Sequence, residues 1–384
     1  MKVALLGFGV VGSGVAKIVD GAENDEMSDI SIKKILVHTP AKMRQDPRCV
    51  VDINEILDDP EIDVVCECIG GLEPAHTYVK EALERGKSCI TSNKKMIASF
   101  ASELFPLAQE KGVALAYESS VGGGIPWITN IERIRRLEEV KSFRGIFNGT
   151  TNYILSAMDQ EGSDFAECLQ KAQELGYAEA DPSDDIDGFD VRYKVALSCL
   201  AAFRRYVKPE DIITWGVRRI SKQDFIWAKD HKLSIKLVGQ ARENKGGLSA
   251  YVLPLMFRND HLLSNVSANF NALELDSANL GTAAFVGQGA GSLPTAHALV
   301  QDILDVNEGR RLDMSQAKPA ELKDPEAASY YLRTKQGEFF DQAGVIKEQV
   351  GKDAYVTKPL PLSRINDLAK QAGDDGLFLA EVEL

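Results

Sequence analysis

The sequence lacks several features by which a class of protein is usually recognised. None of its apolar runs approaches the roughly 20 residues that a membrane-spanning helix needs, so no membrane partner is predicted. Its net charge is −13 and no basic stripe stands out, which argues against a nucleic-acid partner, because binding a phosphate backbone requires clustered cations. The N-terminus enters a strand-like run at residues 3–6 without the charged region and cleavage site of a signal peptide.

Cysteine and histidine are scarce and unpatterned. The six cysteines, at positions 49, 66, 68, 89, 168 and 199, show neither metal-ligand nor redox spacing, so we expect reduced thiols and a cytoplasmic location. The five histidines, at positions 38, 76, 231, 261 and 297, share no motif. A catalytic histidine is therefore not favoured, although histidine is a common acid–base catalyst.

The length of 384 residues and the 44% content of hydrophobic residues predict two or three soluble domains with real cores. Over residues 1–125, apolar runs at 3–6, 32–37, 64–69, 88–91 and 113–117 alternate with helical patterns. This alternation predicts an α/β domain with a parallel sheet. From about residue 126 to 280 the pattern is that of an α+β domain, and a polar, proline-marked stretch begins at residue 307.

A glycine-rich turn follows the first predicted strand and opens a helix: Gly7-Phe8-Gly9-Val10-Val11-Gly12. In such a turn the first glycine permits the tight bend, the second lets a pyrophosphate approach the backbone, and the third allows close helix–strand packing. The helix N-terminus then faces the phosphate charge. The sequence therefore predicts a dinucleotide-binding domain of the Rossmann type.

The end of the second predicted strand bears on the choice of dinucleotide. An acid there would bind the ribose 2′-hydroxyl of NAD, but the strand ends in Val37-His38-Thr39, with Lys42 and Arg44 just beyond. Small polar and cationic groups suit a 2′-phosphate, so NADP is favoured. Lys42 and Arg44 as solvated loop charges, and hence the use of NAD, remain an alternative.

Four segments resemble, in order, motifs of the homoserine dehydrogenases. They are residues 119–126 (SSVGGGIP), 145–155 (GIFNGTTNYIL), 179–194 (EADPSDDIDGFDVRYK) and 287–296 (GQGAGSLPTA). The resemblance runs from residue 1 to about 306, some four-fifths of the chain. It implies a cofactor domain over 1–125, completed by about 280–306, and an α+β substrate and dimerisation domain over 126–280, paired as a homodimer. The implied reaction is NAD(P)-dependent, reversible reduction of L-aspartate 4-semialdehyde to L-homoserine in threonine and methionine biosynthesis.

A lysine and an aspartate in the third motif suit aldehyde reduction, which needs a proton or positive field at the carbonyl oxygen. Asp190 and Lys194 are four residues apart on an apparent helix and so share one face. Alone, such a pair is usually a surface salt bridge, but Val191 and Val195 indicate a packed helix. The resemblance implies that Lys194 is the proton donor and that Asp190 is its partner, which holds the lysine and also binds the substrate.

The same resemblance implies the groups that bind the substrate. Glu179 would receive the α-amino group, and Gly149 and Thr150 the carboxylate. Lys94 would lie near the nicotinamide and the reacting carbonyl. Without the motif, Glu179 would be taken for an exposed loop acid, which stays the alternative.

The resemblance adds two sets of backbone sites. Gly70, at a strand end, and Gly289, in the fourth motif, would face the cofactor. A structural monovalent cation, commonly sodium, would be held at the positions matching the family's site, which are Glu118, Val121, Gly123 and Ile125. Oxygen ligands on a glycine-containing backbone suit a hard cation.

Residues 307–384 form a C-terminal extension. Within it, residues 329–333 resemble the first strand of a threonine-sensing ACT domain, and residues 377–382 could form a closing strand. The intervening stretch looks too short for a complete domain, so a truncated ACT-like region is predicted, without an assigned feedback role.

Two other functions fit part of this pattern. A non-catalytic NAD(P) sensor would keep the glycine-rich turn but would need none of Lys94, Glu179, Asp190 and Lys194, which stand here together. A dehydrogenase of another amino-acid semialdehyde or hydroxy acid is the second alternative, and Glu179 with Gly149 and Thr150 favours a zwitterionic substrate.

Overall fold

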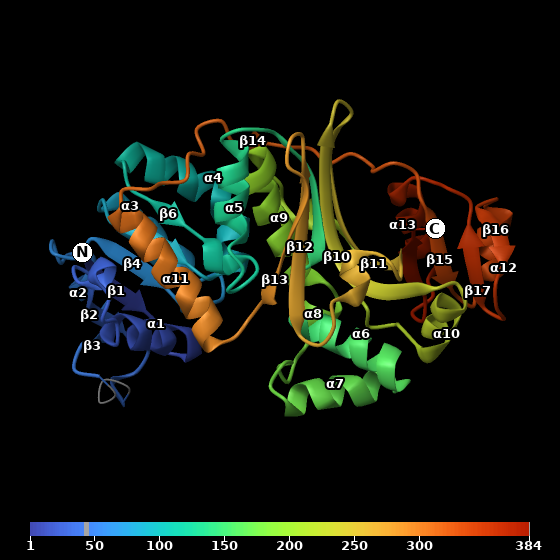
Figure 1. The fold of residues 1–384 in the computed structure, drawn as a ribbon, viewed down its shortest axis with the longest axis horizontal. Coiled ribbons are helices and arrows are strands. Elements are labelled where there is room, and N and C mark those ends of the chain that lie inside the picture. The colour runs from blue at the N-terminus through green and yellow to red at the C-terminus, as the bar shows by residue number, and fades with distance from the viewer. Residues whose placement is uncertain (42–45, 384) are drawn as a thin grey trace. The chain divides into compact units, whose positions relative to one another are not determined.

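The computed structural model describes residues 1–41 and 46–383 (Figure 1). They form two compact units, each made of three stretches of chain. Unit 1 comprises residues 1–138, 196–208 and 287–320, and unit 2 comprises residues 139–195, 209–286 and 321–384. In the described part of the chain, no helix combines the length and the apolar character that crossing a membrane demands.

Unit 1 is built on a six-stranded parallel sheet with the strand order β3-β2-β1-β4-β5-β6. The strands are β1 (Lys2–Leu6), β2 (Ser31–Leu36), β3 (Cys49–Val50), β4 (Val64–Glu67), β5 (Ser88–Thr91) and β6 (Leu115–Ala116). This is the Rossmann-type order, and the chain reverses direction across the sheet between β1 and β4. The carboxyl ends of those two strands therefore form the crevice where such folds bind a dinucleotide.

Helices cover this sheet because its strands are apolar on both faces. They include α1 (Val10–Asp20), α3 (Ala75–Glu84), α4 (Lys94–Lys111), α5 (Trp127–Arg135) and α11 (Ser292–Asn307). Val3, Val15 and Leu299 belong to one buried cluster, which joins β1, α1 and α11. At Gly14 a side chain would begin 3.0 Å from the Cβ of Ala296, so glycine lets α1 and α11 pack closely. Residues 287–320 thus complete the unit.

Unit 2 contains a long mixed sheet with the order β13-β12-β7-β10-β11-β18-β15-β17-β16. Its strands are β7 (Val140–Ile146), β10 (Leu233–Asn244), β11 (Gly247–Arg258), β12 (Phe270–Ser277), β13 (Gly281–Gln288), β15 (Ser329–Arg333), β16 (Ile346–Gln349), β17 (Ala354–Thr357) and β18 (Phe378–Val382). The long hairpin β10–β11 is antiparallel in continuous register from Leu233↔Arg258 to Asn244↔Gly247. The α/β and α+β fold class expected from the sequence is confirmed.

The helices of unit 2 include α6 (Gly149–Glu161), α7 (Phe165–Glu174), α8 (Ser183–Ile186), α10 (Lys222–Asp230) and the first part of α9 (Phe189–Phe203). Helix α9 packs on β10 at Gly239, where a Cβ would come 2.4 Å from Val195 and 2.7 Å from Val191. Glycine at this one strand position therefore sets how closely α9 approaches the sheet.

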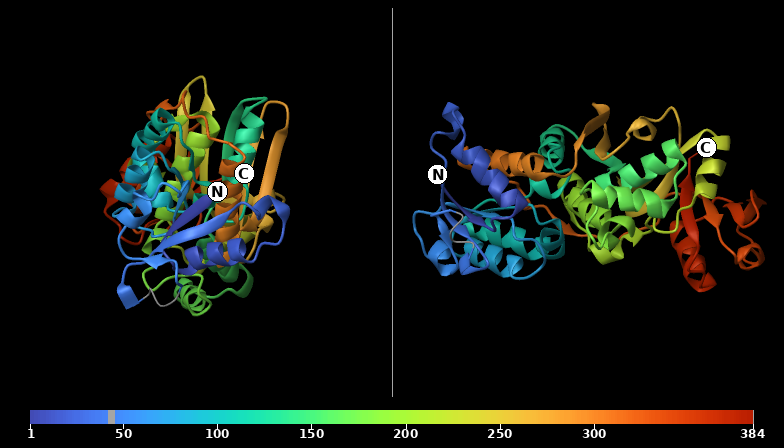
Figure 2. Two further views of the ribbon diagram at one scale, coloured as in Figure 1. Left: turned by 90° about the vertical axis from the view of Figure 1, so that its left-hand side faces the viewer. Right: turned by 90° about the horizontal axis from the view of Figure 1, so that it is seen from below.

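The C-terminal extension contains a complete βαββαβ set, which can be followed at the red end of the colour scale (Figure 2). Its elements run β15, α12 (Gly337–Gln342), β16, β17, α13 (Leu362–Ala372), β18. The expectation that this stretch is too short for a complete domain was wrong. All six helices and strands fit into it because each is only 4 to 11 residues long. Strand β18 pairs in parallel with β11, so the extension continues the sheet of unit 2.

The observed elements differ from the predicted ones mainly at their ends. The apolar run of residues 248–253 predicts a strand that ends at residue 253, whereas β11 runs to Arg258. The two-residue β3 was not predicted. Ser163, before a helical pattern, predicts an N-cap, but helix α7 is capped by the next residue, Asp164, in a capping box with Glu167. An acid and a serine side by side are both good caps, so the sequence alone did not separate them.

The close contact at Gly239 can be tested with Gly239→Ala. The added methyl group would collide with two stiff β-branched side chains, so we expect the free energy of unfolding to fall by about 1–3 kcal/mol. Denaturant unfolding measures this loss. The double variant Gly239→Ala with Val195→Ala should lose less stability than the sum of the losses in the two single variants. The reason is that Val195→Ala relieves the collision with the added methyl group. Simple additivity would contradict the proposed contact.

Candidate active site

The glycine-rich turn of unit 1 has the geometry that phosphate binding requires. Gly7 has φ +102°, and a Cβ there would lie 2.9 Å from the carbonyl oxygen of Cys68. At Gly12 a Cβ would lie 2.2 Å from the carbonyl oxygen of Gly7, so only glycine allows α1 to start against the turn. At Gly9 no atom lies within 4 Å of the Cβ position, which leaves its backbone open to a ligand.

A buried glutamate organises the neighbouring turn, and sequence reasoning missed it. Glu67 ends β4 and accepts hydrogen bonds from the amides of Ile69 (2.7 Å) and Gly70 (3.1 Å) and from the hydroxyl of Thr91 (2.5 Å). Burial raises the pKa of this carboxyl, and the three donors oppose the rise. Gly70 and the next glycine have φ of +79° and +76°, so the turn exposes backbone at the strand end. The only signal in the sequence was an acid in an apolar strand.

Lys94 is the first residue of α4, at the carboxyl end of β5. Asn93 caps this helix by accepting from the amide of Met96 (3.1 Å), and its Nδ2 donates to the carbonyl of Gly71 (2.7 Å). The Asn93 side chain therefore ties the turn after β4 to the start of α4. Lys94 is half-buried at this joint.

The groups expected near a 2′-phosphate are only partly described. His38 is exposed and lies two residues beyond the end of β2. Lys42 and Arg44 lie outside the described residues.

The loop of residues 118–125 and the return segment meet within unit 1. At Gly123, φ is +59°, and a Cβ would lie 2.5 Å from the carbonyl oxygen of Gly289. The Gly124 amide donates to the carbonyl of Gln288 (3.2 Å). Two candidate cation ligands of this loop, Val121 and Ile125, are buried. The loop is thus held between α5 and the segment that leads into α11.

The fourth candidate cation ligand, Glu118, uses its side chain to cap a helix. Its carboxylate accepts from the amides of Ile128 (2.9 Å) and Thr129 (2.7 Å) at the start of α5. Burial raises the pKa of Glu118. Across residues 1–41 and 46–383, no cluster of three or more histidine, cysteine or acidic side chains could hold a metal ion. A cation at this loop would therefore depend on backbone carbonyl oxygens.

In unit 2 the predicted lysine–aspartate pair is buried. Lys194 Nζ lies 2.8 Å from Asp190 Oδ2 and donates to the carbonyl of Phe147 at 2.7 Å. The two charged side chains are only 8% and 4% exposed. A buried ammonium group is tolerated only when it is paired and hydrogen-bonded, as here. The alternative of a surface salt bridge is therefore excluded.

Asn148 links the ion pair to α8 and to the start of α6. Sequence reasoning did not predict a role for this residue. Its Nδ2 donates to Asp190 Oδ2 (2.8 Å) and Asp185 Oδ1 (2.7 Å). Its Oδ1 caps α6 by accepting from the amide of Thr151 (2.8 Å). Asparagine is a preferred N-cap, and this position before a helix was the signal that could have found it.

The groups expected to bind the substrate lie around the start of α6. At Gly149 a Cβ would come 2.6 Å from the carbonyl oxygen of Asn269, so a side chain is not tolerated. Thr150 donates to the carbonyl of Tyr177 (2.5 Å), which places the loop after α7 against this helix end. Glu179 is exposed on that loop, two residues after Tyr177. The structure thus groups Gly149 and Thr150, with Glu179 on the adjoining loop.

Proteins of known sequence and structure resemble this chain over most of its length. The homoserine dehydrogenase of Bacillus subtilis is 37% identical over 323 residues, which are 82% of this chain and 75% of that protein. The homoserine dehydrogenase of Synechocystis is 39% identical over 316 residues, which are 80% of this chain and 73% of that protein. The crystal structure of a homoserine dehydrogenase from Thiobacillus denitrificans has a TM-score of 0.90 at 30% identity and covers 100% of this chain and 98% of its own.

Two family models match successive parts of the chain. Residues 7–118 match the NAD-binding domain of homoserine dehydrogenase, and residues 126–304 match homoserine dehydrogenase itself. Together with the fold, these matches define the class: an oxidoreductase that acts on a CH–OH group with a nicotinamide cofactor. The chain belongs to the homoserine dehydrogenase family. Its reaction is the reversible NAD(P)-dependent reduction of L-aspartate 4-semialdehyde to L-homoserine.

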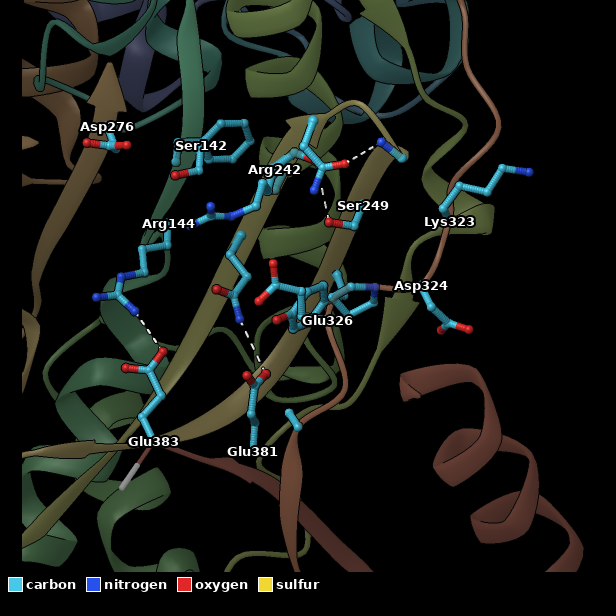
Figure 3. A pocket seen from close by; sticks show the side chains of 18 of the residues that line it. Ser142, Arg144, Arg242, Ser249, Asp276, Lys323, Asp324, Glu326, Glu381 and Glu383 are labelled. Atoms are coloured by element: carbon cyan, nitrogen blue, oxygen red, sulfur yellow. Dashed lines mark hydrogen bonds and ion pairs between the residues drawn. The ribbon is translucent and has the colours of Figure 1, made fainter. Parts of the chain in front are cut away.

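A hollow of about 750 Å³ lies elsewhere in unit 2, between β7, β10, β11, β12, β18 and the segment of residues 323–328 (Figure 3). Glu381 lies in its wall, beside Gln240 and Glu383. Burial, together with the negative charge of Glu383, raises the pKa of Glu381 to about 7, although Tyr251 and Arg144 oppose the rise. The hollow therefore contains a carboxyl that titrates near neutral pH.

This carboxyl should make stability depend on pH. Because the folded pKa of Glu381 lies above its ordinary value of 4.5, its contribution is fully present below about pH 4.5 and is lost as pH rises through about 7. The shift corresponds to as much as about 3 kcal/mol. We expect Glu381→Gln to remove this part of the decline, measured as the free energy of unfolding from pH 4.5 to 8. Glu326→Gln, an exposed carboxyl of the same hollow, is the control. Parallel curves for the native chain and Glu381→Gln would contradict the assignment.

Proposed function

We propose that Lys194 donates the proton to the carbonyl oxygen of L-aspartate 4-semialdehyde. The observation that carries this proposal is the burial of its ammonium group between Asp190 Oδ2 and the carbonyl of Phe147. A buried, oriented ammonium group stabilises negative charge on a nearby oxygen far better than a solvated one. The bound reduced nicotinamide supplies the hydride to the carbonyl carbon.

Asp190 has a positioning role in this proposal. It keeps the lysine charged by pairing with it, and Asn148 in turn holds Asp190. After the proton has left Nζ, the neutral amine remains hydrogen-bonded to Asp190 and regains a proton from solvent. Lys94 is the second cation proposed to act at the reacting carbonyl, from the N-terminus of α4.

The start of α6 is the proposed site for the substrate carboxylate. Gly149 and Thr150 are the first two residues of this helix, where unpaired backbone N–H groups and the helix dipole favour an anion. Glu179 is proposed to bind the α-amino group, because a carboxylate complements an ammonium group. Holding the two charged groups at the non-reacting end of the amino acid would orient the aldehyde for reaction.

The turn of residues 7–12, the strand-end glycine Gly70 and the return-segment glycine Gly289 are proposed to hold the cofactor. The open backbone at Gly9 supports the pyrophosphate site. NADP is proposed as the preferred dinucleotide, with His38 and Arg44 at the 2′-phosphate. A hyperthermophilic archaeal homoserine dehydrogenase with 25% identity and a TM-score of 0.69, covering 80% of this chain and 98% of its own, was solved in complex with NADPH.

Three further features belong to the same proposal. A sodium ion would be held by the loop containing Glu118, Val121, Gly123 and Ile125, where the positive φ at Gly123 and the buried backbone suit carbonyl ligands. The chain would act as a homodimer, and it would work in the cytoplasm, where its free cysteines stay reduced.

The role of Lys194 is tested by Lys194→Ala with NADPH and L-aspartate 4-semialdehyde, followed at 340 nm. We expect kcat to fall at least about a hundredfold, because proton donation is lost. Lys87→Ala is the matched control, since Lys87 is also a buried lysine but donates to the carbonyls of Asp59 and Ile62 in unit 1. A native rate in folded Lys194→Ala would refute the proposed donor. No turnover by the native chain, despite NADPH binding, would favour a sensor.

The role of Glu179 is tested by Glu179→Gln. We expect KM for the semialdehyde to rise by roughly tenfold or more with a smaller change in kcat, because a charge-assisted contact to the non-reacting end is lost. Asp184→Asn, an exposed acid five residues further along the chain, should leave KM unchanged. Equal effects of the two variants would show only a general influence of negative charge.

A further inference from the structure

One backbone carbonyl in unit 2 accepts hydrogen bonds from two buried side chains. The carbonyl of Phe147 accepts from Lys194 Nζ at 2.7 Å and from Asn271 Nδ2 at 2.8 Å. Phe147 lies between the end of β7 and the N-cap of α6, outside both elements. Because its carbonyl belongs to no regular element, its direction depends on the groups that bind it.

Asn271 is completely buried on β12, yet only half of its amide is satisfied. The Nδ2 atom must face Phe147, since a carbonyl can only accept. This orientation leaves Asn271 Oδ1 buried without a hydrogen-bond partner among the described residues. An unpaired buried oxygen costs about 1–3 kcal/mol, which offsets what the hydrogen bond from Nδ2 contributes, so the asparagine adds little net stability here.

A second buried asparagine of the same unit shows the contrast. Asn152 Nδ2 donates to the carbonyls of Val266 (3.2 Å) and Phe270 (2.9 Å), and its Oδ1 accepts from Lys236 Nζ (3.1 Å). Both ends of its amide are used, and its contacts join α6 to the first residue of β12 and to the segment before it. Asn152 is therefore a structural asparagine and serves as the matched reference for Asn271.

We propose that Asn271 is a positioning residue for Lys194, an inference that rests on the proposed function. The Asn271 amide fixes the Phe147 carbonyl, and that carbonyl and Asp190 together take two of the three N–H directions of the lysine. The amide of Asn271 thus holds in place an acceptor that orients the ammonium group of Lys194.

The first measurement compares Asn271→Ala with Asn152→Ala. Without the amide, the Phe147 carbonyl can rotate and Lys194 loses a fixed acceptor, so kcat should fall about tenfold, which corresponds to one hydrogen bond. KM should change less than about threefold, because the proposed substrate contacts at Gly149 and Glu179 remain. Asn152→Ala should lower stability while kcat stays within about threefold of the native value.

The second measurement uses Asn271→Asp, which keeps the shape of the side chain. An ionised carboxylate cannot donate to the Phe147 carbonyl, but a protonated carboxyl can. The ratio of the variant kcat to the native kcat should therefore be lowest above neutral pH and should rise about tenfold as pH falls toward 5. A purely structural role would not produce this pH-dependent recovery.

The outcomes separate this inference from the function on which it rests. If Lys194→Ala abolishes the rate while both Asn271 variants keep the native kcat and pH profile, the donor stands and the role of Asn271 is wrong. Equal losses of kcat in Asn271→Ala and Asn152→Ala, with no recovery of Asn271→Asp at low pH, would also overturn it. If Lys194→Ala keeps the native rate, the proposed donor itself fails. Circular dichroism and NADPH binding verify that each variant is folded.

Discussion

The buried ammonium group of Lys194 is the constraint around which unit 2 is arranged. A charge removed from water must be compensated by close, well-oriented partners, and here an aspartate and a backbone carbonyl provide them. The carbonyl is available only because β7 ends before Phe147. Helix α9, which carries the lysine, reaches the sheet only because β10 has a glycine at position 239. The end of β7, the glycine at position 239 and the ion pair of Lys194 with Asp190 therefore depend on one another.

In unit 1, as in unit 2, a buried acid keeps neighbouring groups in a fixed orientation. It is an NAD-binding domain, and the proposed dinucleotide site consists of backbone amides at strand ends. Such turns need left-handed glycines, and they need an acceptor that keeps them in place. The buried Glu67 is that acceptor, since it binds the amides of Ile69 and Gly70 and the hydroxyl of Thr91. In both units a buried acid orders a group proposed to contact the ligand.

Local patterns were enough to predict the Rossmann-type sheet, the glycine-rich turn and the pairing of Asp190 with Lys194, because each is encoded within a few residues. Features that depend on distant residues were not predictable. Asn271 is 124 positions from the carbonyl it binds, and nothing in its neighbours distinguishes it from a turn asparagine. The completeness of the C-terminal βαββαβ set was also missed, since its strands of four or five residues give little periodicity.

The C-terminal extension is a structural part of the sheet of unit 2. Strand β18 pairs with β11, and Glu383, just beyond β18, forms an ion pair with Arg144 on β7 at 2.8 Å. Arg144 also pairs with Glu274 on β12, the strand that carries Asn271. Because Phe147 follows Arg144 by three residues, the end of the chain contacts both strands that hold the acceptor of Lys194. The extension is therefore linked through β7 and β12 to the proposed proton donor, without a contact to the substrate.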